Sequence, residues 1–330
     1  MIEKLGFNLI RLIFLSLTTS YHFSKIFLEN RQSPPGKLID IGGCKIHLYT
    51  KGEGYPTVIL DHSLGGIDGY FLIDEIAKIT RVCIYDRPGY GWSQASPQPR
   101  CSQVIVRELH ELLQRAEIQP PYILVGNSFG SYNVRLYAHD YPEEVIGIVL
   151  TDGLSEVSML KLPFALKLIK LFFLSGFLIS ILGAILGLIR ILGDLRFFEF
   201  IKPELRQFSP KIVTQVKRSF YRPQHWLTMA RELWNLEKSA KQVEAANHLQ
   251  NIPLVSIKAN YFFKPSLWNF YLPLRLVDQF RDKMHINLLQ LAHNSRQLST
   301  SQSSHFVWID QPQVMITAIK QFMIDQSNSF

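Results

Sequence analysis

Residues 126–130 read Gly-Asn-Ser-Phe-Gly and lie between a short apolar run and a segment of helical character. A Gly-x-Ser-x-Gly sequence in this position is typical of a sharp strand-to-helix turn that exposes a serine hydroxyl above a sheet. The chain reverses so tightly at Ser128 that side chains two positions away would collide, which explains Gly126 and Gly130. The Phe129 N–H and the start of the next helix then face any negative charge that develops there. The motif predicts a nucleophilic serine at position 128.

A serine hydroxyl is a weak nucleophile and needs a base within hydrogen-bond reach, which a third group must orient. For a serine on such a turn, the acid and then the histidine follow it along the chain. The sequence holds ten histidines, and His305 lies between the last strand-like run and the last helix. This position favours a loop at the reactive edge of the sheet, so we predict that His305 is the base.

The acid is less obvious from the sequence. The loop after the strand at 252–259 would be its usual place, but residues 260–266 contain no carboxylate. Asp152 directly follows the strand at 145–151, one strand away from the serine turn and at the same edge. We therefore predict that Asp152 orients His305.

Other interpretations of the acidic residues stay open. Asp152 could instead cap the helix that follows it, and Asp278 and Asp282 are weaker alternatives for the acid. Asp310 is only five residues beyond His305 and is expected to cap the final helix.

A second backbone N–H must join that of Phe129 to hold an oxyanion, and it should come from the loop after the strand at 57–61. This loop, His62–Gly66, contains two glycines that permit close backbone approach. The Leu64 amide is the predicted second donor. After the next strand, Asp86 and Arg87 are interpreted as structural braces of the loops around the site.

Composition limits the class of protein. The chain has 330 residues, of which 47% are hydrophobic, and 35 Lys and Arg against 27 Asp and Glu. No basic block is long enough for a nucleic-acid partner, and a basic, apolar chain fits an anionic membrane surface better. Three cysteines have neither metal-ligand spacing nor the pattern of a disulfide framework. We expect no cofactor and no metal, and the sequence leaves the oligomeric state open.

Two apolar segments raise the question of a membrane. Leu5–Phe27 is interrupted by Arg11, and residues 1–34 are interpreted as a hydrophobic anchor and linker. Leu171–Ile189 is uncharged and long enough to span a bilayer. However, a crossing there would divide one sheet between two sides of the membrane, so we interpret this segment as a lid helix that contacts the membrane. An ordinary buried helical hairpin is the alternative.

Apolar runs that alternate with helical segments predict a mostly parallel sheet with helices on both faces, edged by an antiparallel hairpin. The alternation of strands and helices is interrupted at about residues 154–249, which we interpret as a helical lid insertion in a domain at 35–330. The predicted strands are 37–41, 45–51, 57–61, 81–85, 122–125, 145–151, 252–259 and 297–301. The principal predicted helices are 70–79, 102–118, 129–140, 285–293 and 315–324.

Taken together, these residues resemble the α/β-hydrolase superfamily, from about Pro35 to Ile324 apart from the insertion. The runs 35–43, 81–93 and 121–126 look like a bacterial subgroup with an N-terminal membrane anchor. The resemblance implies an eight-stranded sheet, a serine nucleophile and cleavage of an ester or related acyl bond. Serine at position 128 argues against the epoxide-hydrolase and dehalogenase branches, which use Asp there.

The leading hypothesis is a membrane-associated serine esterase for a hydrophobic acyl substrate, with Ser128, Asp152 and His305 as its catalytic triad. One alternative is acyl transfer to an acceptor other than water, since both reactions begin with an acyl-enzyme. Another is a non-catalytic membrane-associated binding protein on the same fold.

Overall fold

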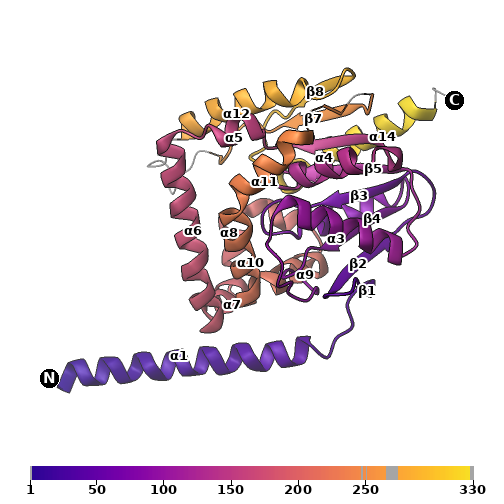
Figure 1. The fold of residues 1–330 in the computed structure, drawn as a ribbon. Coiled ribbons are helices and arrows are strands. Elements are labelled where there is room, and N and C mark those ends of the chain that lie inside the picture. Colours follow the sequence, from indigo (N-terminus) through magenta and orange to yellow (C-terminus); the bar gives the residue numbers. More distant parts are fainter. Residues whose placement is uncertain (1, 247, 250, 265–273, 328–330) are drawn as a thin grey trace.

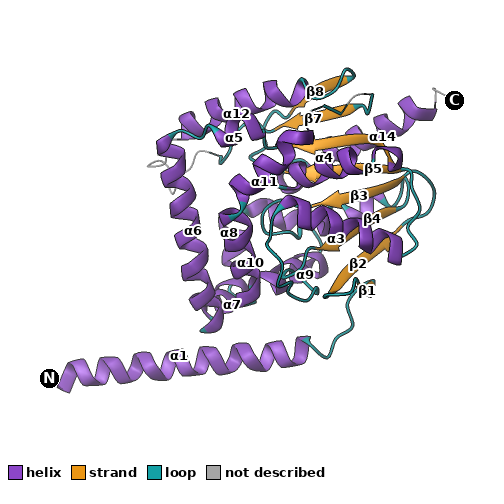
Figure 2. Ribbon diagram, viewed as in Figure 1, coloured by secondary structure: helices purple, strands orange, loops and turns teal. Residues whose placement is uncertain are grey.

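An eight-stranded sheet runs through the molecule with helices on both of its faces (Figures 1 and 2). The structure is a computed structural model, and it describes residues 2–246, 248–249, 251–264 and 274–327. The strand order is β1-β2-β4-β3-β5-β6-β7-β8. The β1–β2 and β2–β4 pairs are antiparallel, and all other pairs are parallel. The strands are β1 (Lys37–Asp40), β2 (Lys45–Lys51), β3 (Thr57–Asp61), β4 (Val82–Asp86), β5 (Tyr122–Asn127), β6 (Val145–Thr151), β7 (Leu254–Lys258) and β8 (Ser295–Ser299).

The central strands are buried on both faces, as expected for a parallel sheet covered by helices. Along β5, Leu124 packs into one hydrophobic core while Ile123 and Val125 pack into the other. Helices α3, α4 and α12 cover the first face, and α2, α13 and α14 cover the second. Their bounds are α2 (Ile73–Ile76), α3 (Ser102–Arg115), α4 (Gly130–Asp140), α12 (Leu274–Leu289), α13 (Val307–Asp310) and α14 (Pro312–Ser327); short 3-10 turns occur at η1 (Asp68–Phe71) and η2 (Pro142–Glu144).

The segment between β6 and β7 is helical, and we call residues 156–246 the cap. The cap stands beside the sheet at the left of Figure 1, with α6 along its outer side. Its elements are α5 (Glu156–Leu160), α6 (Phe164–Ile185), α7 (Leu188–Asp194), α8 (Phe197–Ile201), η3 (Pro203–Gln207), α9 (Pro210–Phe220), α10 (Pro223–Trp234), α11 (Leu236–Val243) and η4 (Glu244–Ala246).

Helix α1 (Ile2–Glu29) extends away from the sheet and contacts the cap at the α6–α7 turn (Figure 1). Thr18 Oγ1 donates a 2.7 Å hydrogen bond to the carbonyl oxygen of Leu186. At Gly187, which has φ +74°, a Cβ would lie 2.4 Å from the carbonyl oxygen of Thr18. Glycine is needed there because α1 approaches the turn so closely.

Two helices differ from the sequence prediction by more than about three residues at one end. A continuous helix at 70–79 is wrong, because the segment forms the short elements η1 and α2. Bonds to the third preceding residue interrupt the α-helical pattern on both sides of α2, from Leu72 to Gly69 at 3.0 Å and from Ile79 to Ile76 at 2.9 Å. The helix predicted at 285–293 is α12, which begins eleven residues earlier. Its buried face includes Arg281 and His285, so apolar periodicity does not reveal it.

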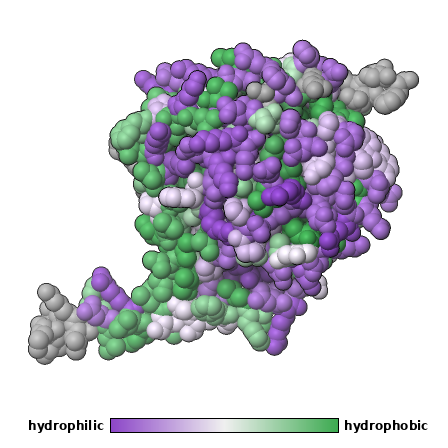
Figure 3. All heavy atoms as spheres, viewed as in Figure 1, coloured by the Kyte–Doolittle hydropathy of each residue, from purple (hydrophilic) through white to green (hydrophobic). Residues whose placement is uncertain are grey.

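Among the described residues, one helix is long and apolar enough to cross a membrane, and it is α6 rather than α1. Hydrophobic side chains nevertheless gather along α6 and over the part of α1 nearest to it (Figure 3). Exposed large side chains on α6 include Phe164, Leu171, Ile179 and Leu182, each at least half exposed. Most of this apolar surface therefore has no protein packed against it.

Candidate active site

Ser128 occupies the turn between β5 and α4. Its φ is +49°, in the left-handed region that residues other than glycine rarely adopt. The Ser128 N–H donates a 2.9 Å hydrogen bond to the carbonyl oxygen of Thr151, at the end of the neighbouring strand β6. The Ser131 hydroxyl donates a 2.6 Å bond to the Ser128 carbonyl oxygen. These bonds on both sides hold the strained turn, as is common where a reactive side chain must be exposed.

The two flanking glycines are required by space. A Cβ on Gly126 would lie 2.6 Å from Val134 and 2.7 Å from the carbonyl oxygen of Gly130. A Cβ on Gly130 would lie 2.5 Å from the carbonyl oxygen of Asp61. The second contact also shows that the loop after β3 lies directly against the start of α4.

Asp152 and His305 lie together, although 153 residues separate them in the sequence. Oδ2 of Asp152 is 2.5 Å from Nδ1 of His305. The carboxylate accepts, so Nδ1 carries the proton and Nε2 is left with a free lone pair. A histidine in this tautomer can take a proton from a hydroxyl group.

Arg281 and His285 of α12 also bind Asp152, and sequence reasoning missed both. Arg281 donates through Nε at 3.0 Å to Oδ2 and through Nη2 to Oδ1. His285 Nε2 lies 3.0 Å from Oδ1, and its Nδ1 lies 3.1 Å from the Ser256 hydroxyl. Burial alone favours a neutral acid, but hydrogen bonds from His285 and His305 and the charge of Arg281 hold the pKa of Asp152 well below its ordinary value. The carboxylate is therefore ionised at neutral pH.

The other acidic residues near the site have different partners. Asp278 accepts a 2.8 Å hydrogen bond from the Phe262 N–H and another from Arg281, and Asp282 pairs with Lys258. Neither is bonded to His305, so the geometry favours Asp152 over these two alternatives.

Asp310 does not cap the final helix, so this expectation is wrong. Its Oδ2 accepts bonds of 2.7 Å from both the backbone N–H and the hydroxyl of Ser304, and Oδ1 pairs with Lys202 at 2.5 Å. Asp310 thus fixes the residue before His305, and Lys202 of the helical cap between β6 and β7 binds the same carboxylate.

The loop after β3 is held by Arg87, as the sequence suggests. Arg87 donates to the carbonyl oxygens of His62 and Ser63 at 2.8 and 2.7 Å and to Asp61 at 2.7 Å. Its Nε donates to Glu232 of α10 at 2.9 Å, and both side chains are fully buried. One guanidinium therefore ties the cap to this loop and fixes the direction of its carbonyl groups.

The two predicted oxyanion donors have free amides. The backbone N–H groups of Leu64 and Phe129 donate no hydrogen bond to any residue in the described ranges. Leu64 follows directly on the two carbonyl groups that Arg87 binds, and Phe129 is the N-cap residue of α4. Free N–H groups beside a helix N-terminus can stabilise a developing negative charge.

Ser128 itself is 8% exposed, and its hydroxyl makes no hydrogen bond to a side chain or carbonyl of the described residues. Catalytic hydrogen bonds in structures without substrate are often long or poorly aligned, so this does not exclude His305 as its base.

Aromatic side chains connect the cap to His305. The ring of Phe262 lies 5.1 Å from that of His305, and Phe263 lies 6.5 Å from Phe173 of α6. Phe177, also on α6, packs against both hydrophobic cores. The inner face of α6 and the loop after β7 therefore place apolar surface beside the histidine.

Comparison with known proteins agrees with this architecture. The α/β hydrolase fold family model matches residues 56–178. The protein YqjL of Bacillus subtilis (strain 168) is 24% identical over 286 residues, which cover 86% of this chain and 90% of YqjL. YbdG of the same strain is 25% identical over 148 residues, covering 44% of this chain and 46% of YbdG. A 1-acylglycerol-3-phosphate O-acyltransferase of Arabidopsis thaliana is 32% identical over 108 residues, covering 31% of this chain and 26% of that protein. This chain thus spans less than half the length of YbdG and about a quarter of the acyltransferase.

Solved structures share the fold. Cfl2 from Burkholderia cenocepacia aligns with a TM-score of 0.66 and 19% identity, over 87% of this chain and 94% of Cfl2. The enol-lactonase from Burkholderia xenovorans LB400 aligns with a TM-score of 0.60 and 14% identity, over 87% of this chain and 100% of the lactonase. With the family model over residues 56–178, the strand order and the turn at Ser128, these similarities establish the fold: the chain has the α/β-hydrolase fold.

Proposed function

We propose that this α/β-hydrolase-fold chain is a serine hydrolase that cleaves an ester or related acyl bond through an acyl-enzyme. The 2.5 Å contact between Asp152 and His305, at the sheet edge that also carries Ser128, is the observation that supports it most directly. Asp152 holds His305 in the tautomer whose Nε2 can act as a base.

The proposed reaction has two halves. The Ser128 oxygen attacks the acyl carbon while His305 Nε2 takes the hydroxyl proton, and the N–H groups of Leu64 and Phe129 stabilise the oxyanion. The bond to the leaving alcohol then breaks, and His305 returns the proton to it. Water then attacks the acyl-enzyme while His305 takes its proton, and His305 gives this proton to the Ser128 oxygen as the acid leaves.

A fluorophosphonate probe tests this mechanism in the full-length protein. The wild-type chain should be labelled, and Ser128→Ala should lose both labelling and ester hydrolysis, with a fall in kcat on the order of 10⁶. Labelling that persists in Ser128→Ala would assign the nucleophile elsewhere. A well-folded wild-type chain that is never labelled would instead favour the non-catalytic binding protein.

A hydrophobic acyl chain fits the surroundings of His305. Phe262 contacts the histidine ring, and Phe173 and Phe177 bring apolar surface from α6. We therefore expect kcat/KM on a panel of p-nitrophenyl esters to rise with acyl chain length. A preference for acetyl esters would contradict this part of the proposal.

Acyl transfer is the second candidate, because one relative is a 1-acylglycerol-3-phosphate O-acyltransferase. An acyl-enzyme can react with an alcohol in place of water. Product analysis with added glycerol or glycerophosphate separates the two reactions, since a transferase forms the new ester in preference to the free acid.

We also propose that the chain associates with a membrane through α1 and the outer face of α6. Leu9, Ile10, Leu12 and Leu17 of α1 are each more than half exposed, like many residues of α6. Carbonate extraction of membranes that contain the chain with and without residues 1–34 tests which helix anchors it. If α6 suffices, the truncated chain stays in the membrane fraction; if α1 is the anchor, the truncated chain is released.

A further inference from the structure

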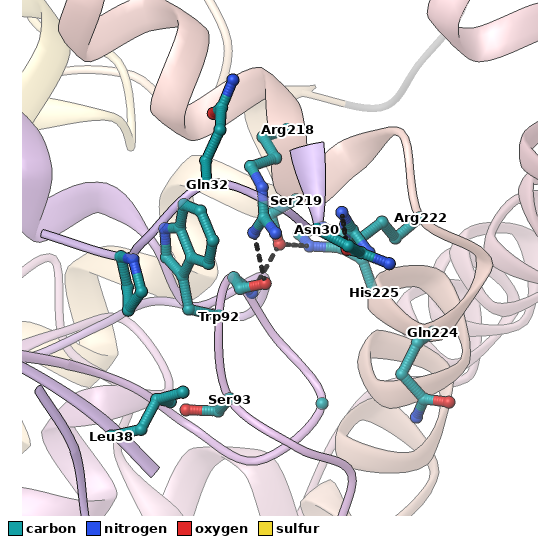
Figure 4. A pocket seen from close by; sticks show the side chains of 13 residues that line it. Asn30, Gln32, Leu38, Trp92, Ser93, Arg218, Ser219, Arg222, Gln224 and His225 are labelled. Atoms are coloured by element: carbon teal, nitrogen blue, oxygen red, sulfur yellow. Dashed lines mark hydrogen bonds between the residues drawn. The ribbon is translucent and has the colours of Figure 1, made fainter. Parts of the chain in front are cut away.

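A cavity of about 360 Å³ lies where the linker after α1, the loop after β4 and the cap helices α9 and α10 meet. Figure 4 shows Arg218 beside Trp92, with Asn30 and Arg222 to the right of Arg218 in this view. Ser128, Asp152 and His305 do not line it, so it is separate from the proposed triad. The described residues around it include two arginines but neither Asp nor Glu.

Arg218 is a buried cation without a counter-ion in the described part of the chain. Its side chain is 7% exposed, and it forms no ion pair within 4 Å with any described residue. Nη1 donates to the carbonyl oxygen of Gly91 at 3.1 Å, and the guanidinium carbon lies 3.3 Å from the centre of the Trp92 ring. Nε is buried and has no hydrogen-bond partner in the described part of the chain. Buried charges are normally paired, so this arrangement favours an external anion.

The neighbouring charges do not neutralise Arg218. Glu29 of α1 is shared by Arg190, at 2.6 Å, and Arg222, at 3.3 Å. The Asp86 charge also acts on Arg218, but its carboxylate pairs with His47 at 2.9 Å. Burial and, next in size, the charge of Arg222 lower the pKa of Arg218 to about 10, which still leaves the guanidinium ionised at neutral pH. The Nε atom of Arg222 is also buried and unpartnered in the described ranges. Positive charge is therefore in excess at this junction.

The N-terminus of α10 adds the positive end of a helix dipole to this cavity. Gln224 and His225, in the first turn of this twelve-residue helix, line the cavity. Arg222 is the N-cap residue, and its side chain makes no capping hydrogen bond. The first helical residue, Pro223, has no N–H, and the His225 N–H donates to the Arg222 carbonyl oxygen at 3.1 Å. The Gln224 N–H and the positive end of the helix dipole are therefore what this terminus offers an anion.

We propose that this cavity binds a phosphate group carried by a small molecule or lipid headgroup. Two guanidinium groups and a helix N-terminus match the charge and the several acceptor oxygens of a phosphate better than a single carboxylate. Cavities of roughly 300–1,000 Å³ are the usual size for small-molecule sites, so there is room for more than an isolated ion. Exposed Asn30 and Gln32 at the rim give access from solvent and lie just beyond the apolar surface of α1.

The test measures ligand binding in the full-length protein in detergent. One arm titrates glycerol 3-phosphate by calorimetry, with sodium chloride at matched ionic strength as the reference. The other arm measures flotation with phosphatidylcholine vesicles that do or do not contain phosphatidic acid. Binding in the first arm identifies a soluble phosphate ester, and phosphatidate-dependent flotation alone identifies a lipid headgroup.

Arg218→Met and Arg222→Gln should each weaken the observed binding at least tenfold, whereas Arg206→Gln, at an exposed position of η3, should leave it unchanged. Because Arg218 is buried, circular dichroism must show that the Arg218→Met variant is folded. If that variant does not fold, the binding measured with Arg222→Gln decides the question. Absence of wild-type binding in both arms, or equal binding by both variants and wild type, overturns the proposal. Because the readout is binding, loss of the proposed hydrolase activity would not affect it.

Discussion

Asp152 gives one carboxylate oxygen to His305, at 2.5 Å, and the other to His285, at 3.0 Å. Arg281 reaches both oxygens from the side. The carboxylate is therefore fixed in position and charge before a substrate arrives, and its role can be tested separately from that of Ser128.

Asp152→Asn should reduce kcat by roughly 10⁴, because an amide can favour the wrong tautomer of His305. Asp282→Asn is the matched control, since Asp282 pairs with Lys258 and its side chain is about half exposed. Steady-state hydrolysis of a p-nitrophenyl ester checks both variants. Near-wild-type turnover by Asp152→Asn would move the search to Asp278.

Arg281→Met should lower the free energy of unfolding by about 3–5 kcal/mol, because it leaves the Asp152 carboxylate buried with less compensation. In an Asp152→Asn background the same change should cost much less, since no buried charge is then left behind. Urea unfolding of the wild type, the two single variants and the double variant measures this coupling. The exposed Arg275→Met on the same helix should change stability by about 0.5 kcal/mol or less, and equal costs of Arg281→Met in both backgrounds would refute the coupling.

Local patterns in the sequence predicted the strands and the placement of Ser128, Asp152 and His305. Ser128 and Asp152 directly follow the apolar strands β5 and β6, and His305 lies six residues beyond the end of β8, so strand position brings all three to one edge of the sheet. The partners of Asp152 on α12 could not be found in this way, because charged residues on a helix ordinarily face solvent. The i, i+4 spacing of Arg281 and His285, beside buried Met284 and Leu288, is the one local signal of a shared inward face.

Contacts between residues far apart in the chain could not be predicted from the sequence either. Arg87 was recognised as a brace, but its partner Glu232 lies 145 residues away in the cap. Neither residue has a local pattern that identifies the other, because the pairing depends on how the cap packs on the sheet. The same is true of Arg218: only its packing in the fold shows that no described residue serves as its counter-ion.

Gly130→Ala should destabilise the chain by about 1–3 kcal/mol or more and abolish activity, because the new Cβ would meet backbone atoms of the loop that carries Leu64. Thermal unfolding and ester hydrolysis measure the two effects. Gly43→Ala is the control, since a Cβ there meets nothing within 4 Å. An active, stable Gly130→Ala would mean that the loop after β3 and the turn at Ser128 can separate.

Ile179→Asp, at a position of α6 that is 68% exposed, should weaken binding to anionic vesicles about tenfold, since it removes one apolar side chain from the proposed membrane surface. Vesicle flotation with the full-length protein measures it. Ile286→Asp, on α12 and 59% exposed, should have no effect. Equal losses in both variants would indicate a general effect of charge rather than contact through α6.

His47 and Asp86 form a fully buried pair whose contribution to stability should depend on pH. The His47 Nδ1 lies 2.9 Å from Asp86, and Nε2 faces the carbonyl oxygen of Pro35. Burial alone would lower the pKa of His47, but the Asp86 charge and these hydrogen bonds raise it above 6.5. Both nitrogens face acceptor oxygens, so the fold favours the protonated imidazole.

The stabilisation from this pair is complete below the unfolded pKa of about 6.5 and is lost as the pH rises through the higher folded pKa. His47→Gln should cost about 3–5 kcal/mol at about pH 6, where it breaks a buried ion pair, and the cost should fall as the pH rises through the folded pKa of His47. Urea unfolding over a series of pH values measures this dependence, with His248→Gln as an exposed control. A cost that increases with pH would contradict a raised pKa for His47.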